Sequence, residues 1–146
     1  MKISTKVRYG MRLMFQLAVH HGRGYVFLKD IARLEGISEK YLSQIVIPLR
    51  ASGLVISSRG SKGGYMLATE PAQVTAKHVV QALDADFTAA RRMKNTDARD
   101  YYPGSVTKIV WETLFQKIDD ALNAITLQQL LDAHVANAAN EIEYHI

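Results

Sequence analysis

The 146-residue sequence contains no cysteine. Disulfide bonds, cysteine zinc sites, thiol redox sensing and a thiolate-held iron–sulfur cluster are therefore excluded. Long apolar runs are missing as well, since none approaches the roughly 20 residues that a membrane helix requires. Residues 1–11 carry cations but are not followed by a secretory apolar stretch. We expect a cytoplasmic protein with no membrane association, no bound metal and no other cofactor.

Catalytic motifs are absent too. No histidine stands at catalytic spacing from a nucleophile or a carboxylate pair, and there is no phosphate-binding loop. The adjacent His20 and His21 would point about 100° apart on a helix, which makes them a poor metal pair. His78 and His134 are most simply interpreted as helix residues. The sequence therefore predicts that the protein is not an enzyme.

Charge is divided unequally along the chain. Residues 1–65 carry eleven Lys and Arg against three Asp and Glu, whereas residues 66–146 carry seven against eleven. The first half thus has a balance of +8 and the second of −4, which together give the net charge of +4. This asymmetry indicates that the first half meets a polyanion. A basic, solvated surface is the alternative.

Residues 37–68 organise the chain. We predict a helix over Ser38–Ala51, with Ser38 as its N-cap and Gly53 after its end. The apolar residues on one face of this helix are Leu42, Ile45, Val46 and Leu49. Two strands, Leu54–Ser57 and Tyr65–Ala68, enclose a loop with three glycines, two cations and no apolar residue. Such a loop suits close approach to a polyanion, and a solvated hairpin is the alternative.

The residues before this helix favour the nucleic-acid interpretation. A short helix over 28–35 is followed by Gly36, and we expect Ile31, Leu34 and Ile37 to face the core. A supporting helix, a short turn with glycine and a second helix form a helix-turn-helix. The glycine loop would then be its wing. The sequence thus predicts a winged helix-turn-helix that binds double-stranded DNA.

Candidate DNA contacts follow from these positions. The first turns of a recognition helix reach base edges in the major groove. Here they offer Ser38, Lys40, Tyr41, Ser43 and Gln44, of which Tyr41 could equally be structural. Arg59 at the wing is placed to enter a minor groove. A helix over 5–21 carries cations and a tyrosine near its start, which are candidates for phosphate contact or simply exposed; they are Lys6, Arg8, Arg12 and Tyr9.

The second half contains three further predicted helices and a polar segment. Thr75 would cap a helix within 74–83. Residues 84–104 lack periodicity and offer Arg91, Arg92, Tyr101 and Tyr102 as a candidate effector site, although a mobile basic loop near DNA is the alternative.

We expect Ser105 to cap a long helix over 106–124. Its apolar surface exceeds one stripe, which suggests a homodimer interface, with packing inside one subunit as the alternative. The expected interface residues are Val106, Ile109, Val110, Leu114, Ile118 and Leu122. Thr126 would cap one more short helix, and the tail from 137 has no clear signal.

Several short motifs resemble the Rrf-two family of bacterial winged-helix regulators. They are residues 1–9 (MKISTKVRY), the pattern Ile37-Ser38-x-x-Tyr41-Leu42-x-Gln44, residues 49–55 (LRASGLV), residues 59–65 (RGSKGGY) and residues 125–127 (ITL). The resemblance covers residues 1 to about 132. It implies a homodimer joined by the long helix, with two winged heads on a pseudo-palindromic operator. It also implies phosphate contacts by Tyr9, Arg50, Ser61 and Lys62.

Two departures from the family pattern matter. Cluster-binding members often carry glutamate at the position of Ser43, where it helps to select bases, so the operator sequence stays open. Those members also place three cysteines in the segment that corresponds to residues 91–102, with a further ligand near Lys108. Neither feature exists here. We favour the interpretation that this chain is a family member that naturally lacks a cluster, over the alternative that its cysteines were replaced.

The predicted fold is mainly α (α+β), a winged helix-turn-helix with a two-stranded wing and a long C-terminal dimerisation helix. The expected division is a DNA-binding domain over 1–83, a loop over 84–104, dimerisation helices over 105–132 and a tail over 133–146. We predict a sequence-specific, homodimeric transcriptional regulator that acts as a repressor. The alternatives are a protein-interaction adaptor with secondary DNA binding, or a regulator that senses an unknown small-molecule effector through the 84–104 loop.

Overall fold

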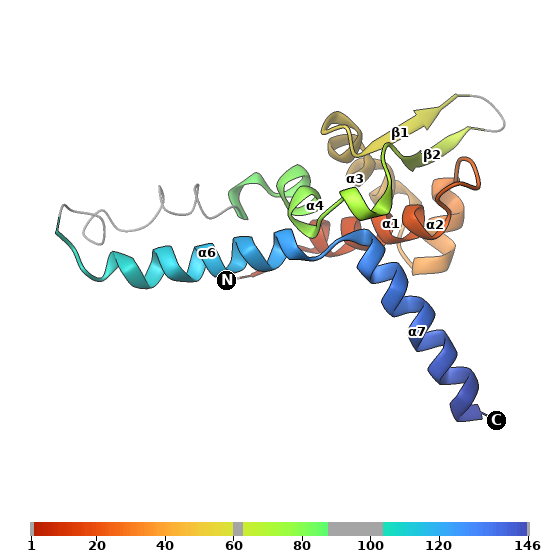
Figure 1. The fold of residues 1–146 in the computed structure, drawn as a ribbon. Helices are drawn as coiled ribbons and strands as arrows, with labels where there is room; N and C mark the ends of the chain where they lie inside the picture. Colours follow the sequence, from red (N-terminus) through yellow and green to blue (C-terminus); the bar gives the residue numbers. More distant parts are fainter. Residues whose placement is uncertain (1, 60–62, 88–103, 146) are drawn as a thin grey trace.

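The computed structural model describes residues 2–59, 63–87 and 104–145. In the described part, helices of the N-terminal half pack together with one small antiparallel sheet at their edge, and two further helices extend from this body in different directions (Figure 1). We call residues 2–59 and 63–87 the head. The elements are α1 (Thr5–Val19), α2 (Leu28–Glu35), α3 (Glu39–Ala51), β1 (Val55–Ser58), β2 (Gly64–Leu67), the 3-10 helix η1 (Pro71–Gln73), α4 (Ala76–Leu83), the 3-10 helix η2 (Ala85–Phe87), α6 (Lys108–Ala124) and α7 (Leu127–His145).

Helix α1 is the centre of the head. It begins after Ser4, whose Oγ accepts a hydrogen bond from the Val7 amide at 3.2 Å, and it ends two residues before the predicted limit. Such a cap satisfies an amide that has no partner within the helix. One face of α1 is fully buried, with Leu13 and Met14 at 0% exposure and Leu17 at 1%. The other helices of the head are built around this apolar face.

Helices α2 and α3 form the predicted helix-turn-helix. Gly36 takes a φ of 65° after α2, and the Ile37 amide donates to the Ala32 carbonyl at 3.0 Å. This left-handed conformation is one that glycine adopts without a steric cost. One expectation is wrong, because Leu34 is 57% exposed whereas Ile31 and Ile37 are buried. The inner face of α2 contains Glu35 in place of Leu34, since Glu35 lies one turn beyond Ile31 and contacts α1.

Strands β1 and β2 form the wing as an antiparallel pair, with Val55 opposite Leu67 and Ser58 opposite Gly64. The predicted strands lie within one residue of the observed ones. The segment before α2 pairs with this wing, because Val26 and Tyr65 exchange two backbone hydrogen bonds of 2.8 Å. A Cβ at Gly64 would lie 2.5 Å from the Val26 carbonyl oxygen, so this junction requires glycine. The wing is thereby fixed to the segment that precedes α2.

Helix α4 connects the head to the C-terminal helices. Thr75 caps it as predicted, accepting from the His78 amide at 3.2 Å while His78 Nδ1 accepts from the Thr75 amide at 3.0 Å. Two backbone bonds then join its start to the turn between α6 and α7. The Ala76 amide donates to Ile125 at 2.8 Å, and the Leu127 amide donates to Val74 at 2.9 Å. The α6–α7 turn is therefore held by backbone pairing.

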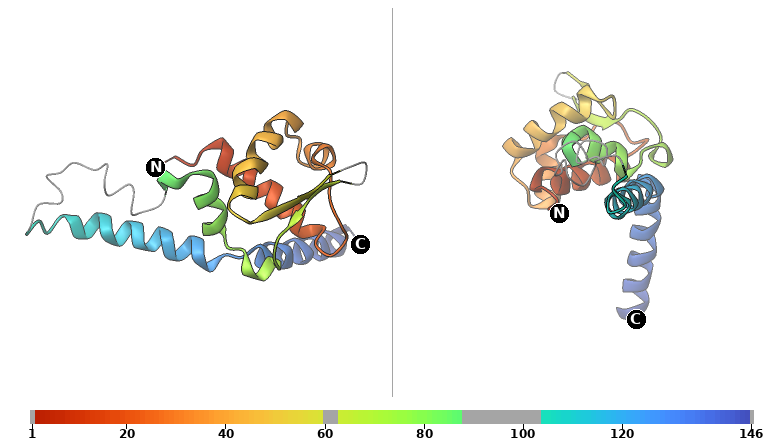
Figure 2. Two further views of the ribbon diagram at one scale, coloured as in Figure 1. Left: turned by 90° about the horizontal axis from the view of Figure 1, so that it is seen from above. Right: turned by 90° about the vertical axis from the view of Figure 1, so that its left-hand side faces the viewer.

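The C-terminal helices depart from expectation at both ends. Helix α6 begins at Lys108, and Ser105 does not cap it, because Ser105 is buried and its Oγ pairs with Thr107 Oγ1 at 3.0 Å. Helix α7 was expected to be short, but it continues to His145 through the segment predicted as a tail. Figure 2 shows α6 and α7 leaving the head in different directions. Within the described ranges, no helix combines the length and the apolar character needed to cross a membrane.

Candidate nucleic-acid interface

The first turns of α3 present a polar surface to solvent. Leu42 and Leu49 are 0% exposed and Ile45 is 1% exposed, which directs the opposite face of α3 outward. Ser38 Oγ accepts from the Tyr41 amide at 3.3 Å and so fixes where the helix begins. The exposed residues of these turns are Ser38, Glu39, Lys40, Ser43 and Gln44. Four of the five predicted contacts of these turns are therefore exposed, and the fifth, Tyr41, is half-buried.

Two tyrosines join α1 to this surface. The rings of Tyr9 and Tyr41 meet edge to face, with centroids 5.6 Å apart and planes at 88°. Both are half-buried and pack against the apolar core, which supports the structural role for the Tyr41 ring. A cleft of about 380 Å³ is lined by these rings and the start of α3; its lining residues are Tyr9, Gly36, Ile37, Ser38, Lys40, Tyr41 and Gln44. The fold thus brings five predicted residues to one cleft.

Ser43 has a defined hydrogen-bonding state. Its Oγ donates to the Lys40 carbonyl at 2.7 Å. Because a hydroxyl has a single proton, the remaining lone pairs of this exposed side chain can only accept. In this conformation Ser43 suits a base-edge donor such as the amino group of cytosine or adenine. A single accepting hydroxyl differs from the side chains of arginine and glutamine, which can form two hydrogen bonds with one base.

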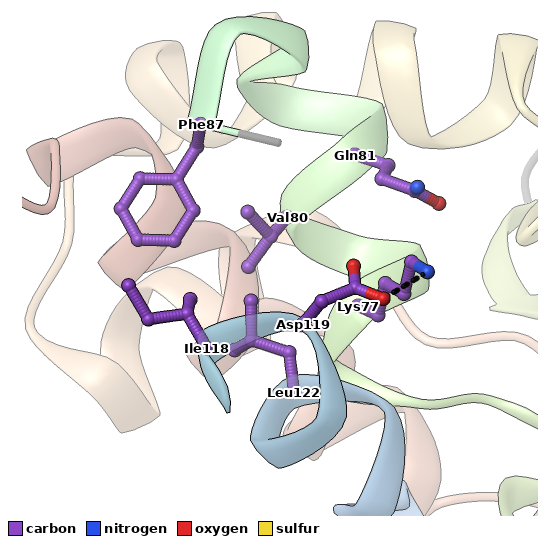
Figure 3. Close-up of a pocket in the computed structure, with 7 residues that line it drawn as sticks. All are labelled: Lys77, Val80, Gln81, Phe87, Ile118, Asp119 and Leu122. Carbon is purple, nitrogen blue, oxygen red and sulfur yellow. Dashed lines mark hydrogen bonds and ion pairs between the residues drawn. The ribbon is translucent and has the colours of Figure 1, made fainter. Parts of the chain in front are cut away.

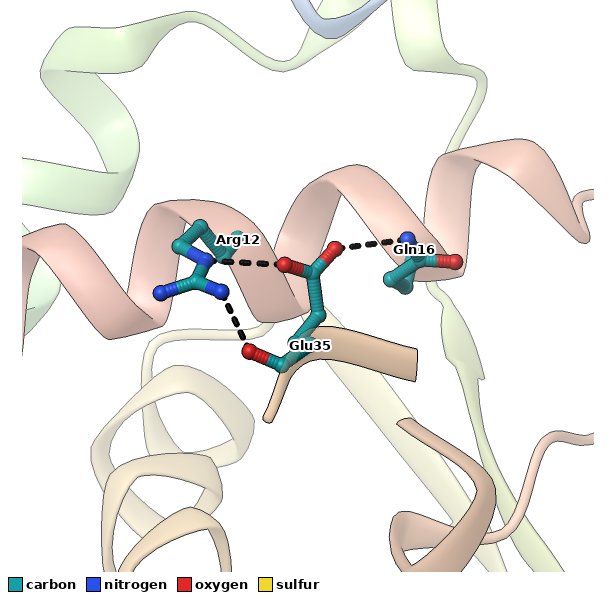
Figure 4. A network of polar contacts seen from close by, with 3 residues as sticks. All are labelled: Arg12, Gln16 and Glu35. Carbon is teal, nitrogen blue, oxygen red and sulfur yellow. Dashed lines mark hydrogen bonds and ion pairs between the residues drawn. The ribbon is translucent and has the colours of Figure 1, made fainter. Parts of the chain in front are cut away.

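Arg12 has a different role from the one that its position suggested. Its Nε donates to Glu35 Oε2 at 2.8 Å, and its terminal nitrogen donates to the Glu35 carbonyl (Figure 4). Gln16 Nε2 donates to Glu35 Oε1 at 2.6 Å. The Arg12 guanidinium also lies 5.6 Å from the centroid of the Tyr9 ring. Arg12 therefore holds the turn of the helix-turn-helix against α1, while Lys6 and Arg8 are exposed on the same helix.

The sequence could not have indicated this network. Arg12 and Glu35 are 23 positions apart, so no helical spacing connects them. Their pairing depends on how α1 and α2 cross. The sequence also did not single out Lys29, an exposed cation 5.4 Å from the Phe27 ring centroid, which lines a groove between the wing and the starts of α2 and α3. The residues of that groove are Phe27, Leu28, Lys29, Glu39, Ser58, Gly63, Gly64 and Tyr65.

The other predicted site residues are placed as follows. Arg59 is exposed just after β1, and Arg50 is exposed in the last turn of α3. Ser61 and Lys62 lie outside the described residues, as do the candidate effector residues Arg91, Arg92, Tyr101 and Tyr102. In the described ranges, no group of three or more His, Asp or Glu side chains is placed to hold a metal ion.

The predicted interface residues of α6 fall into two groups. The first group is exposed: Val106 at 75%, Ile109 and Val110 at 58% and Leu114 at 44%. Its residues lie just before α6 or in the first half of α6, which extends away from the head. Ile118 and Leu122, in contrast, are half-buried and pack against the head. The sequence pattern combined these two surfaces because both are apolar.

A helix-turn-helix with a β-hairpin wing and a polar recognition face, with exposed Arg50 on the same helix and exposed Arg59 at the wing, defines a DNA-binding transcriptional regulator. Comparison with known proteins specifies the family. Residues 3–133 match the Rrf2 (Rrf-two) family model, described as an iron-dependent transcriptional regulator. This chain belongs to the Rrf2 family, and it is a transcriptional regulator, not an enzyme.

Individual relatives agree with this assignment. The HTH-type transcriptional regulator CymR of Bacillus subtilis is 37% identical over 130 residues, which cover 89% of each chain. IscR of Pectobacterium atrosepticum is 35% identical over 144 residues, covering 96% of this chain and 85% of its own. Among solved structures, B. subtilis CymR matches with a TM-score of 0.75, 36% identity and coverage of 91% and 98%. T. potens IscR matches with a TM-score of 0.74, 40% identity and coverage of 92% and 88%. The winged-helix fold predicted from the sequence is therefore confirmed.

Proposed function

We propose that this regulator is a homodimeric repressor that binds a pseudo-palindromic operator and acts without an iron–sulfur cluster. The observation that carries the proposal is the exposed polar start of α3 beside the Tyr9–Tyr41 cleft. Ser38, Lys40, Ser43 and Gln44 would read base edges in the major groove. Lys6, Tyr9, Arg50, Ser61 and Lys62 would contact phosphates, and Arg59 would enter the minor groove.

An apolar groove supports the homodimer. It has a volume of about 510 Å³ between α1, α4, η2 and α6, and its lining is apolar except for two arginines; the lining residues are Ile3, Val7, Arg8, Met11, Arg12, Val80, Phe87, Ile118, Ala121 and Leu122. The same chain exposes an apolar stripe on α6 at Ile109, Val110 and Leu114. A groove and an exposed stripe on one chain suit a two-fold interface, in which each stripe covers the groove of the other copy.

Two recognition helices in such a dimer would face successive major grooves. The half-sites of the operator would then be separated by about one helical turn, or a multiple of it. Bound at a promoter, the dimer would exclude the transcription machinery by occupancy alone. The absence of cysteine from the sequence supports action without a thiolate-held cluster.

The proposal is tested by fluorescence anisotropy on DNA from upstream of the protein's own gene, against a scrambled duplex, across a salt series. We expect a large preference for the upstream duplex. If the two heads neutralise about eight phosphates, the slope of log affinity against log salt should be about −7. Equal binding to both duplexes would contradict sequence-specific autoregulation. No binding to either at low salt would favour the adaptor function.

The variant Arg59→Ala is expected to weaken binding by about 1–3 kcal/mol where the minor groove at the wing is A·T-rich, and by less where it is G·C-rich. A narrow A·T groove concentrates negative potential, which an inserted guanidinium exploits. Competition anisotropy with duplexes that differ only at the flanks measures this difference. Gln44→Ala is the contrasting variant, because it should change which base is preferred inside the half-site. Equal loss with Arg59→Ala on both duplexes would leave only a phosphate contact.

A further inference from the structure

The end of α6 is held to the head by contacts of three kinds. Backbone bonds join Ala76 to Ile125 and Val74 to Leu127 at 2.8 and 2.9 Å. Ile118 and Leu122 pack on the apolar core. The third contact is polar: Lys77 Nζ of α4 donates to Asp119 Oδ2 of α6 at 2.9 Å (Figure 3).

The Lys77–Asp119 pair lies at the edge of an apolar contact. The two side chains are 27% and 31% exposed. The small hollow beside them, which Figure 3 shows from close by, is lined by Val80, Gln81, Phe87, Ile118 and Leu122. In the part of the chain that the structure describes, the other ion pairs are Arg12–Glu35 and Arg33–Asp30, and they lie within the head, as does the hydrogen bond between His21 and Glu70. Among the described ion pairs, Lys77–Asp119 alone connects α6 to the head.

The three contacts constrain α6 differently. Apolar contacts such as those of Val80 and Ile118 depend on buried area and have no preferred direction, so they define the orientation of α6 less sharply than a hydrogen bond does. The backbone bonds fix a point at the C-terminal end of α6 but leave the helix free to tilt about that point. A hydrogen-bonded ion pair requires a particular distance and angle. A partly buried pair of this kind is suited to specifying an arrangement more than to adding stability.

We propose that Lys77 and Asp119 are positioning residues that set the angle between the head and α6, and thereby the separation of the two half-sites that the dimer recognises. This inference rests on the proposed homodimer. From Asp119 back to Lys108, α6 extends about 17 Å at about 1.5 Å per residue. A tilt of about 10° at the joint would displace its far end by about 3 Å, close to the rise of about 3.4 Å per base pair. One base pair also rotates the half-site by about 35°, and in a two-fold dimer each head takes half of the rise and half of the rotation. A looser joint would therefore lower the penalty on a spacer that is wrong by one base pair.

The test begins with duplexes selected from a random pool by the unmodified protein. The best two-half-site duplex is then remade with its spacer one base pair longer and one shorter, and anisotropy is measured at a fixed salt concentration. We expect the unmodified protein to lose about tenfold or more in affinity on the altered spacers, since half-site separation is a geometric requirement. Asp119→Asn and Lys77→Gln should lose less than about threefold, while the thermal midpoint stays within about 5 °C of the unmodified protein.

A matched control lies one residue away. Asp120 accepts from Gln116 on its own helix at 2.8 Å, so Asp120→Asn removes the same charge without affecting α4. This control should keep the full spacer penalty, and the exchange Lys77→Asp with Asp119→Lys should restore part of it. A full penalty in Asp119→Asn, or a lost penalty in Asp120→Asn, would overturn the positioning role. If the unmodified protein selects single half-sites or sediments as a monomer, the proposed homodimer fails instead.

Discussion

Replacing Val110 by glutamate is expected to convert the protein to a monomer and to lower its affinity for a two-half-site duplex by about 100-fold or more. Val110 is 58% exposed, so the substitution leaves the fold of one chain unaffected. In the proposed dimer, however, each new carboxylate would replace an apolar contact in a groove whose lining is apolar apart from Arg8 and Arg12. Burying a charge there without full pairing is unfavourable. Separate heads also lose the effective-concentration advantage that linked sites provide, a factor of about 10² to 10⁴.

Sedimentation and tryptophan fluorescence measure this conversion. Trp111 is the single tryptophan and neighbours Val110, so its emission should shift to the red when the interface is lost. Glu112→Lys is the matched control, because position 112 lies about 200° around the helix from position 110. It should remain dimeric. A Val110→Glu protein that sediments as a dimer and keeps its affinity would place the interface elsewhere.

Leu42→Ala is expected to destabilise the head by about 2–5 kcal/mol, because a fully buried leucine is replaced and a cavity remains. Leu42 is 0% exposed in the first turn of the recognition helix. Domains have a total stability of only about 5–15 kcal/mol, so this loss should be visible as a lower urea midpoint and reduced DNA binding.

Ile47→Ala provides the comparison within the same helix. Ile47 is 65% exposed, and its truncation should change the stability by no more than about 0.5 kcal/mol. Urea unfolding followed by circular dichroism at one protein concentration compares the two variants, since a dimer's stability depends on concentration. Similar midpoints for both variants would mean that α3 is not anchored through Leu42.

Many local elements could be predicted because their signals are local. Helix α2 has the predicted bounds, since Gly36 and Ser38 mark the turn and the next cap within three residues. The buried face of α3 follows from helical spacing, and the wing strands follow from the glycines around them. Where the signals were weaker, boundaries were wrong. Ser105 has the residue type of a cap but is buried beside Thr107, and the alanine- and asparagine-containing end of α7 gave no apolar period.

The sequence by itself determined the winged helix-turn-helix, its basic half and the lack of thiolate ligands, because these depend on residue type and on spacings of a few positions. Only the tertiary structure decided that Arg12 holds Glu35 across 23 positions and that Lys77 holds Asp119 across 42. It also separated the two surfaces of α6, directing Val110 to solvent and Leu122 to the core. Such pairings depend on how helices cross, and crossing is set by the packing of the whole core and not by any local pattern.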